Sequence, residues 1–125
     1  VVIAWLWLFA DMPIWAYLIT AYLAISVLKI RTFLEHKACE DVQGRSVIIE
    51  DRGPLALIFL NNNLHAVHHR HPGVAWYRLP AVYAKSKDDF LNTNGGYQFS
   101  CYARVFAKYF FRAKDPVAHP LWQRR

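Results

Sequence analysis

The stretch Pro13–Ile30 (PIWAYLITAYLAISVLKI) decides what kind of fold this chain can adopt. It is 18 residues long, and its only charged residue, Lys29, lies near its end. A helix rises 1.5 Å per residue, so this length is near the lower limit for crossing the hydrocarbon core of a bilayer. Trp15, Tyr17 and Tyr22 suit a lipid-facing surface on which rings near the ends anchor at the interface. We therefore predict a transmembrane helix, with a buried helix of a large soluble protein as the alternative.

A second apolar run, Val1–Ala10, precedes this helix and ends at Asp11-Met12-Pro13. Proline interrupts the helical hydrogen-bond ladder, so we expect two separate helical segments. The sequence begins inside an apolar run, and we expect it to be the C-terminal part of a longer protein. We assign residues 1–30 to transmembrane segments and residues 31–125 to a cytoplasmic or interfacial part. The predicted fold is mainly α: an integral-membrane helical bundle with a cytoplasmic helical cap.

The charges are distributed unevenly along the chain. The net charge is +6, and 14 of the 15 Lys and Arg residues lie after residue 30. Lys29, Arg31 and Lys37 cluster at the end of the predicted span, so the positive-inside rule places this end in the cytoplasm of an inner-membrane protein. A basic region beside anionic lipid explains the charge, and no groove-reading element or base-stacking platform favours a nucleic-acid partner. Cys39 and Cys101 have no metal-type spacing and are expected to stay reduced.

The segments after the span predict short elements joined by loops. Residues 54–64 (PLALIFLNNNL) are too short to cross a bilayer, and we expect a re-entrant or interfacial helix that leads into His65. Residues 41–53 indicate a polar loop with a short strand at Val47-Ile48-Ile49. Residues 72–83 contain two prolines and indicate an ordered aromatic loop, and residues 92–96 (NTNGG) indicate a turn.

The segment 99–114 has the period of a basic amphipathic helix, which suggests a helix lying in the membrane interface. An ordinary surface helix is the alternative. Its apolar face comprises Tyr102, Val105, Phe106, Tyr109 and Phe110, and its basic face comprises Arg104, Lys108 and Arg112.

Four of the six histidines lie within seven residues, in the run His65–His71 (HAVHHRH). Residues at i, i+3 and i+4 are neighbours on a helix, so His65, His68 and His69 share one face. Clustered imidazoles need partners, and a metal ion satisfies all of them at once. Imidazole suits zinc, copper and iron, so the spacing does not name the metal. Position 66 is Ala, which excludes the HExxH motif of zinc proteases.

This cluster and its surroundings resemble the membrane fatty acid desaturase and hydroxylase superfamily. His65-x-x-His68-His69 is similar to the third histidine box of that family. Further similarity to its bacterial desaturase branch lies in Arg31–His36 (RTFLEH), Asn61–Leu64 (NNNL) and Pro72–Pro80 (PGVAWYRLP). The resemblance covers most of residues 31–120. It implies two iron ions, held by histidines at the cytoplasmic end of a membrane bundle, and an enzyme that uses O2 and two electrons to remove hydrogens from an acyl chain.

The resemblance also implies the ligand set. His65, His68 and His69 are expected to bind iron, and His36 is the candidate for a further ligand upstream of the box. Glu35 is expected to pair with Arg31, four residues earlier, and so to fix the helix face that presents His36.

Two histidines are expected to lie outside the site. His71 precedes Pro72 and is expected to leave the helix, and His119 precedes Pro120 and is expected at the surface. The family also needs two earlier histidine boxes, which are expected upstream of Val1. This sequence alone would then supply about half of the iron shell and should not catalyse.

The resemblance further implies a site for an acyl substrate. We expect an acyl channel formed by apolar helices that include residues 13–30, with Trp76, Tyr77 and Arg78 near its mouth and the lipid headgroup. A basic surface is expected to dock an acidic electron donor such as a ferredoxin, and it comprises Arg70, Arg78, Lys85 and Lys87. The leading hypothesis is an acyl-lipid desaturase. The alternatives are a hydroxylase, a carotenoid ketolase, a small-molecule desaturase, or an inactive fragment with a structural metal site.

Overall fold

The computed structural model describes residues 1–114 and divides the chain into two compact units, Val1–Thr32 and a second that begins at Phe33. His119 lies outside the described residues. The prediction of a mainly helical protein is confirmed. In the part of the chain that the structure describes, the strands are β1 (Ile48–Ile49) and β2 (Gln98–Phe99), which pair in parallel.

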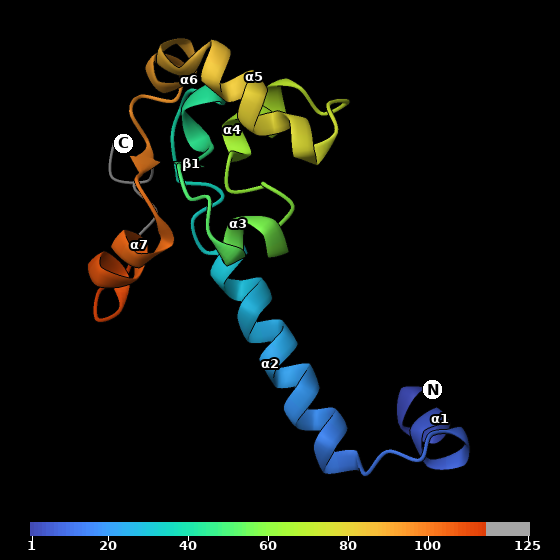
Figure 1. Ribbon diagram of the computed structural model, residues 1–125. Coiled ribbons are helices and arrows are strands. Elements are labelled where there is room, and N and C mark those ends of the chain that lie inside the picture. The colour runs from blue at the N-terminus through green and yellow to red at the C-terminus, as the bar shows by residue number, and fades with distance from the viewer. Residues whose placement is uncertain (115–125) are drawn as a thin grey trace. The chain divides into compact units, whose positions relative to one another are not determined.

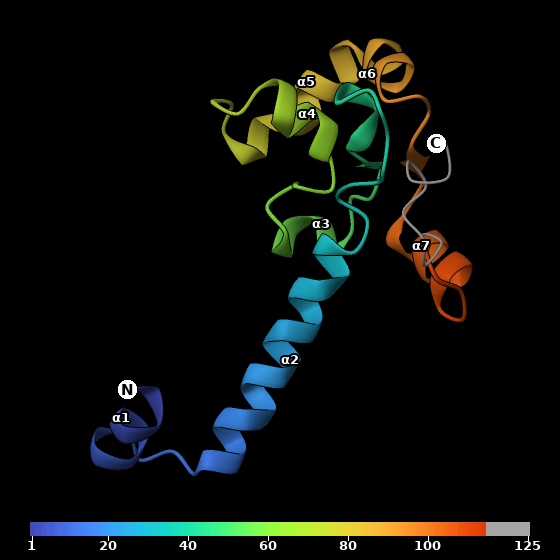
Figure 2. The ribbon, with the colours of Figure 1, turned by 180° about the vertical axis from the view of Figure 1, so that it is seen from behind.

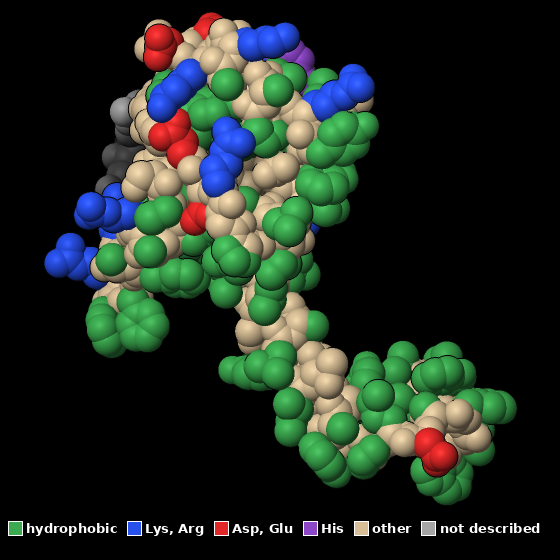
Figure 3. Space-filling model, in the orientation of Figure 1, with side chains coloured by type: hydrophobic (Ala, Val, Ile, Leu, Met, Phe, Trp, Pro, Cys, Tyr) green, Lys and Arg blue, Asp and Glu red, His purple; other side chains and the backbone are tan. Residues whose placement is uncertain are grey.

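The first unit consists of α1 (Val2–Phe9) and α2 (Ile14–Thr32). Pro13 stands just before α2, where its carbonyl accepts hydrogen bonds from the first turn and its missing N–H costs nothing. Among the described helices, α2 alone is long and apolar enough to cross a membrane, and none of its residues is buried. Hydrophobic side chains cover both helices in Figure 3. The predicted helix is therefore present, whereas a membrane bundle would need more apolar helices of this length than these residues contain.

The second unit is built around the buried segment Val47-Ile48-Ile49, each residue of which is at most 2% exposed. The short strand expected here is confirmed as β1. On one side, Ile48 N–H donates to the carbonyl of Tyr97, next to β2. On the other side, Val47 N–H donates to the carbonyl of Glu35. The β-branched segment Val47-Ile48-Ile49 thus brings together the chain near Glu35 and the chain near Tyr97.

Short helices surround this central segment (Figures 1 and 2). They are α3 (Pro54–Ile58), α4 (His65–Arg70), α5 (Leu79–Lys85), α6 (Lys87–Thr93) and α7 (Tyr102–Tyr109), with single 3₁₀ turns η1 (Gln43–Arg45) and η2 (Trp76–Arg78). A buried hydrophobic cluster of the second unit consists of Ile48, Leu64, Val67, Leu79, Tyr83 and Phe90. Burial of each aliphatic or Phe side chain contributes about 1.5–3 kcal/mol, so this cluster is what fixes α4 against β1.

The prediction of a helix over residues 54–64 is wrong beyond Ile58, where α3 ends. Leu60 and Asn61 both have φ of 52°, a left-handed conformation that ends a right-handed helix. Asn61 tolerates it because asparagine is one of the few residues that does so readily, and its N–H donates to the carbonyl of Ala56 at 2.8 Å. The chain therefore turns sharply, and His65 begins a separate helix, α4.

Two other boundaries differ from the expectations. The aromatic loop at residues 72–83 becomes helical from Trp76 onward, because Pro80 sits in the first turn of α5, where proline is tolerated. The amphipathic helix expected over 99–114 is confined to α7, since Phe99 belongs to β2. The turn at residues 92–96 is confirmed, with Gly95 and Gly96 at φ of 65° and 69°.

Candidate metal centre

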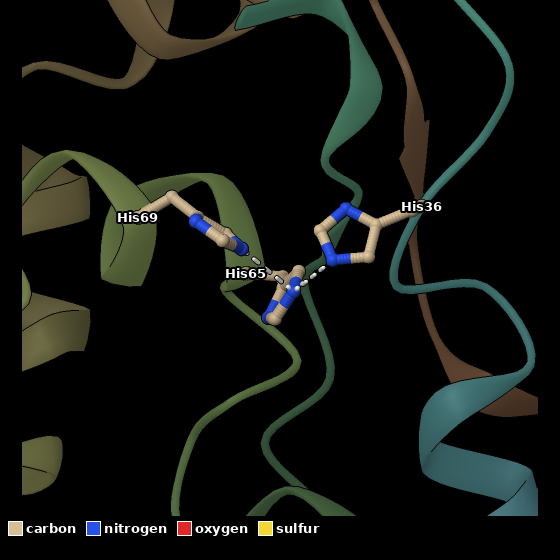
Figure 4. A group of neighbouring side chains, drawn as sticks. All are labelled: His36, His65 and His69. Atoms are coloured by element: carbon tan, nitrogen blue, oxygen red, sulfur yellow. Dashed lines mark hydrogen bonds between the residues drawn. The ribbon is translucent and has the colours of Figure 1, made fainter. Parts of the chain in front are cut away.

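Three histidines from two segments of the second unit point toward one another (Figure 4). His65 and His69 lie one turn apart on α4. His36 lies on the segment after Leu34, where it forms an antiparallel bridge with Ser46. His36 and His65 are 29 positions apart in the sequence, and their contact closes a loop whose two ends carry imidazoles.

The ε nitrogens of these rings converge. Nε2 of His65 lies 3.2 Å from Nε2 of His36 and 3.1 Å from Nε2 of His69. One ring nitrogen from each of the three residues lies within 4.8 Å of the others. His65 is buried at 6% exposure, whereas His36 and His69 are exposed.

Residues 46–50, which include β1, are hydrogen-bonded to both histidine-bearing segments. Val47 donates its N–H to the carbonyl of Glu35, the neighbour of His36, at 3.2 Å. Its own carbonyl accepts from the N–H of Ala66, the neighbour of His65, at 3.1 Å. A single buried residue therefore sets the distance between the two histidine-bearing segments.

Lys114 also holds the backbone at His36 in place. Lys114 Nζ donates to the carbonyls of Phe33 and His36, at 3.0 and 2.6 Å. Burial lowers the pKa of His36, and electrostatic interaction with His69, Lys114 and Arg45 lowers it further, against the opposing effect of Glu35. A lowered pKa favours the neutral ring, which is the form that binds a metal ion.

This arrangement suits a metal ion that binds imidazole nitrogens. Neighbouring Nε2 atoms at 3.1–3.2 Å share protons when no cation is present, and a metal ion replaces those protons with one common partner. Imidazole nitrogens bind iron, zinc and copper. The donor set therefore fits iron as well as the other two metals.

Of the predicted ligands, the structure brings together His36, His65 and His69 but leaves His68 at the margin. The His68 ring centroid lies 6.1 Å from that of His65 and 5.9 Å from that of His69. Consecutive residues are about 100° apart around a helix, so His68 and His69 face different directions. A role for His68 as a ligand stays a prediction.

His71 leaves the helix, as expected. It ends α4 with φ of −131° and ψ of 62°. Its ring packs edge-on against Phe90, with the centroids 6.0 Å apart. The structure thus places His71 in an aromatic contact outside the group of converging nitrogens.

A cavity of about 580 Å³ opens beside the exposed histidines. His36 and His69 line it together with polar groups that include Arg45 and Asn94. Small molecules thus have room to approach the exposed side of the cluster.

The predicted substrate residues form a small aromatic group on η2. The rings of Trp76 and Tyr77 meet edge to face at 5.8 Å, and the Arg78 guanidinium lies 5.9 Å from the Tyr77 ring. Asn61 Nδ2 donates to the carbonyl of Trp76 at 3.2 Å and so ties this turn to the bend before α4. Tyr77 is 61% exposed, so the group presents an open surface.

Half of the predicted basic docking surface is already paired within the chain. Arg70 forms an ion pair with Asp89 and also donates to Thr93 Oγ1. Lys87 forms an ion pair with Glu50 at 2.6 Å. These carboxylates reduce the positive field that was expected to attract an acidic partner.

Sequence reasoning missed the role of Asn62. Its Oδ1 lies 3.3 Å from Nδ1 of His65, and its Nδ2 donates to Oε1 of Glu35 at 2.8 Å. The run of three asparagines before His65 was the available signal. The expected pairing of Glu35 with Arg31 stays a prediction.

Comparison with known proteins identifies the family of this chain. A family model described as fatty acid desaturase matches residues 1–100. The match includes α1, α2 and the three converging histidines. No curated protein and no solved structure matches the chain at a significant level.

Proposed function

Because this chain belongs to the fatty acid desaturase family, we propose that it forms the part of a membrane di-iron enzyme that carries the third histidine box. The reaction that we propose is the introduction of a double bond into an acyl chain, with O2 and two electrons consumed. Family membership supports an oxidoreductase of the desaturase and hydroxylase kind. The observation that carries the proposal to this chain's own residues is the convergence of His36, His65 and His69.

In the proposed site, these three histidines hold iron through their ε nitrogens, and His68 supplies a further imidazole. The complete site contains two irons, with the remaining ligands supplied by histidines outside this sequence. When bound, iron activates O2 for removal of unactivated hydrogens, while the protein places the substrate and excludes water. The hydrogen bonds of Val47 to the neighbours of His36 and His65 support a preformed half-site.

We propose a long-chain acyl lipid as the substrate. Burial of each CH2 contributes about 0.8 kcal/mol, so an apolar helix such as α2 favours a long chain over a small polar molecule. The headgroup is placed near Trp76, Tyr77 and Arg78, where exposed rings and a guanidinium are available. We further propose that the protein lies in the cytoplasmic membrane with its histidines on the cytoplasmic side.

An acidic electron donor such as a ferredoxin would complete the reaction. Arg78 and Lys85 are the members of the basic surface that take no part in the ion pairs found among the described residues, and both lie on η2–α5. We therefore place the docking surface there, narrower than the sequence pattern suggested. Charge complementarity would act mainly on the association rate.

The proposal is tested by expressing the complete coding sequence in a host that lacks desaturases. The expected result is new double bonds in the membrane fatty acids by mass spectrometry and about two irons bound per chain. Hydroxylated fatty acids, oxygenated carotenoids or a desaturated small molecule would assign the protein to the alternative activities. An unchanged profile together with bound zinc would indicate the inactive metal-binding fragment.

A further inference from the structure

Asn62 connects the candidate metal centre to the carboxylate of Glu35. The three asparagines that precede His65 have different contacts. Asn61 donates to the carbonyl of Trp76, and Asn63 donates to the carbonyls of Ile49 and Asp51. Of the three, Asn62, which is 9% exposed, is the one that contacts a histidine of the cluster.

The orientation of the Asn62 amide follows from its neighbours. The Glu35 carboxylate only accepts hydrogen bonds, so it must face the NH2 group of Asn62, 2.8 Å away. The amide oxygen is then turned toward Nδ1 of His65, 3.3 Å away. The opposite orientation would set two acceptors against each other at Glu35.

This orientation selects one tautomer of His65. An amide oxygen only accepts, so the proton of the neutral ring must lie on Nδ1. Nε2 then carries the lone pair, and it is Nε2 that faces His36 and His69 at 3.2 and 3.1 Å. Ligand histidines are commonly held in this way by a hydrogen bond to their other nitrogen.

We infer that Glu35 and Asn62 act as a positioning pair that fixes the Nδ1–H tautomer and the ring orientation of His65, so that Nε2 is presented to a metal ion. Neither residue touches the metal. The inference rests on the proposed function only for its consequence, which is metal binding. The Nδ1–H tautomer of His65 does not itself require a bound metal. Glu35 is well placed for this task, because its carbonyl is bonded to Val47 while its side chain reaches Asn62.

The test uses the full chain in lipid nanodiscs, labelled with ¹⁵N-histidine. The ring nitrogen shifts report which nitrogen is protonated, and His65 is identified by the resonances lost in H65Q. We expect Nδ1–H in the parent chain without metal. In Asn62→Leu the acceptor is absent, so both tautomers should be populated, and affinity for Co²⁺ as an optical probe should fall about 10–100-fold.

A double variant distinguishes positioning from packing. E35Q alone keeps the shape of the side chain but removes the carboxylate that dictates the orientation of the Asn62 amide. The preference of His65 for the Nδ1–H tautomer should therefore weaken. In E35Q/N62D, the amide introduced at position 35 donates to the carboxylate introduced at position 62. That carboxylate in turn accepts from Nδ1 of His65, so both hydrogen bonds are re-created. The Nδ1–H tautomer and a Co²⁺ affinity within about threefold of the parent should return.

The matched control is Asn61→Gly. Glycine accepts the φ of 52° at this position, so only the hydrogen bond to Trp76 is lost. The tautomer of His65 should not change in this variant. The inference is overturned if N62L, or E35Q where N62L does not fold, keeps the Nδ1–H tautomer unchanged. If instead the tautomer shifts as expected but the parent binds no Co²⁺ or Fe²⁺, the positioning role stands and the proposed function fails.

Discussion

At the scale of single residues, His36 depends on contacts that lie far from it in the sequence. The ring meets His65 because the backbone on both sides of it is paired with segment 45–47, and Lys37 N–H adds a bond to the carbonyl of Arg45 at 2.9 Å. Without that pairing, residue 36 would be a flexible connection after α2. The histidine cluster thus depends on the pairing of residues 45–47 as much as on the spacing of the histidines in the sequence.

Replacing His36 by Ala should lower iron binding to the complete protein by more than about tenfold, because one converging imidazole is lost. The measurement is iron per chain after dialysis against a weak chelator, with circular dichroism to check the fold. His71→Gln is the control, since His71 packs on Phe90 and should leave iron content unchanged. Full iron retention in H36A would remove His36 from the site.

The sequence predicted part of this site for physical reasons. Helical spacing brings residues 65 and 69 together whatever the tertiary structure, so that pair was predictable. His36 came from a family resemblance, because no local pattern reports a contact across 29 residues. Asn62 was missed because its direction depends on the left-handed backbone at Asn61, which asparagine tolerates but does not require.

At the scale of elements, one carboxylate joins β1 to two helices. Glu50 follows β1, and its Oε1 accepts from the hydroxyl of Tyr83 on α5 and from Lys87 at the start of α6, both at 2.6 Å. Burial alone would raise the pKa of Glu50, but the hydrogen bonds from Lys87 and Tyr83 outweigh it and lower the pKa. Burial and then the Glu50 carboxylate raise the pKa of Tyr83, so its hydroxyl stays protonated as the donor.

Glu50→Gln should therefore reduce the stability of the second unit by about 1 kcal/mol at pH 7, a magnitude typical of a partly exposed charged hydrogen bond. The folded-state pKa lies below the ordinary value of 4.5, so the contribution is present above that pH and is lost as the pH falls through the lowered pKa. Thermal melts of both chains across this range measure the difference. Glu40→Gln, at an exposed carboxylate, is the control, and a gap between E50Q and the parent that persists at a pH of about 2 would contradict the prediction.

Helix α7 has one buried side and one exposed aromatic side. Tyr102 and Val105 are buried, whereas Phe106, Phe110 and Phe111 are 40%, 74% and 92% exposed. Exposed aromatic rings next to Arg104 and Lys108 fit the interface of an anionic bilayer. The helix begins later than the sequence period suggested because residues 98–99 pair with β1, a contact that periodicity does not encode.

Spin labels at position 111 and position 104 should therefore report different surroundings in vesicles that contain anionic lipid. In a background without the native cysteines, the label at 111 should collide mainly with lipid-soluble O2 and the label at 104 mainly with a water-soluble nickel complex. The difference should shrink in vesicles of zwitterionic lipid, because cation attraction to the surface is lost. Equal aqueous exposure of both labels would make α7 an ordinary surface helix.

At the scale of the whole molecule, α2 was predictable because length and apolarity are local properties. Whether other helices pack around it was not predictable, since helix packing depends on partners beyond a single span. The second unit was less predictable still. Its core joins Ile48, Val67 and Phe90, whose proximity follows from long-range burial and not from any local repeat.

The final prediction concerns which side of the membrane carries the histidines. Asp11 is the only charged side chain in residues 1–28, whereas Lys29, Arg31 and Lys37 follow in quick succession. The positive-inside rule therefore predicts that the chain after α2 lies in the cytoplasm. The two native cysteines, Cys39 and Cys101, both belong to the second unit and are partly exposed free thiols. A membrane-impermeant maleimide should therefore label them in inside-out vesicles and not in right-side-out vesicles. C39S and C101S separate the two signals, and loss of both thiols in the double variant gives the background. Labelling from the outer face would reverse the orientation and place the candidate metal centre beyond the reach of a cytoplasmic electron donor.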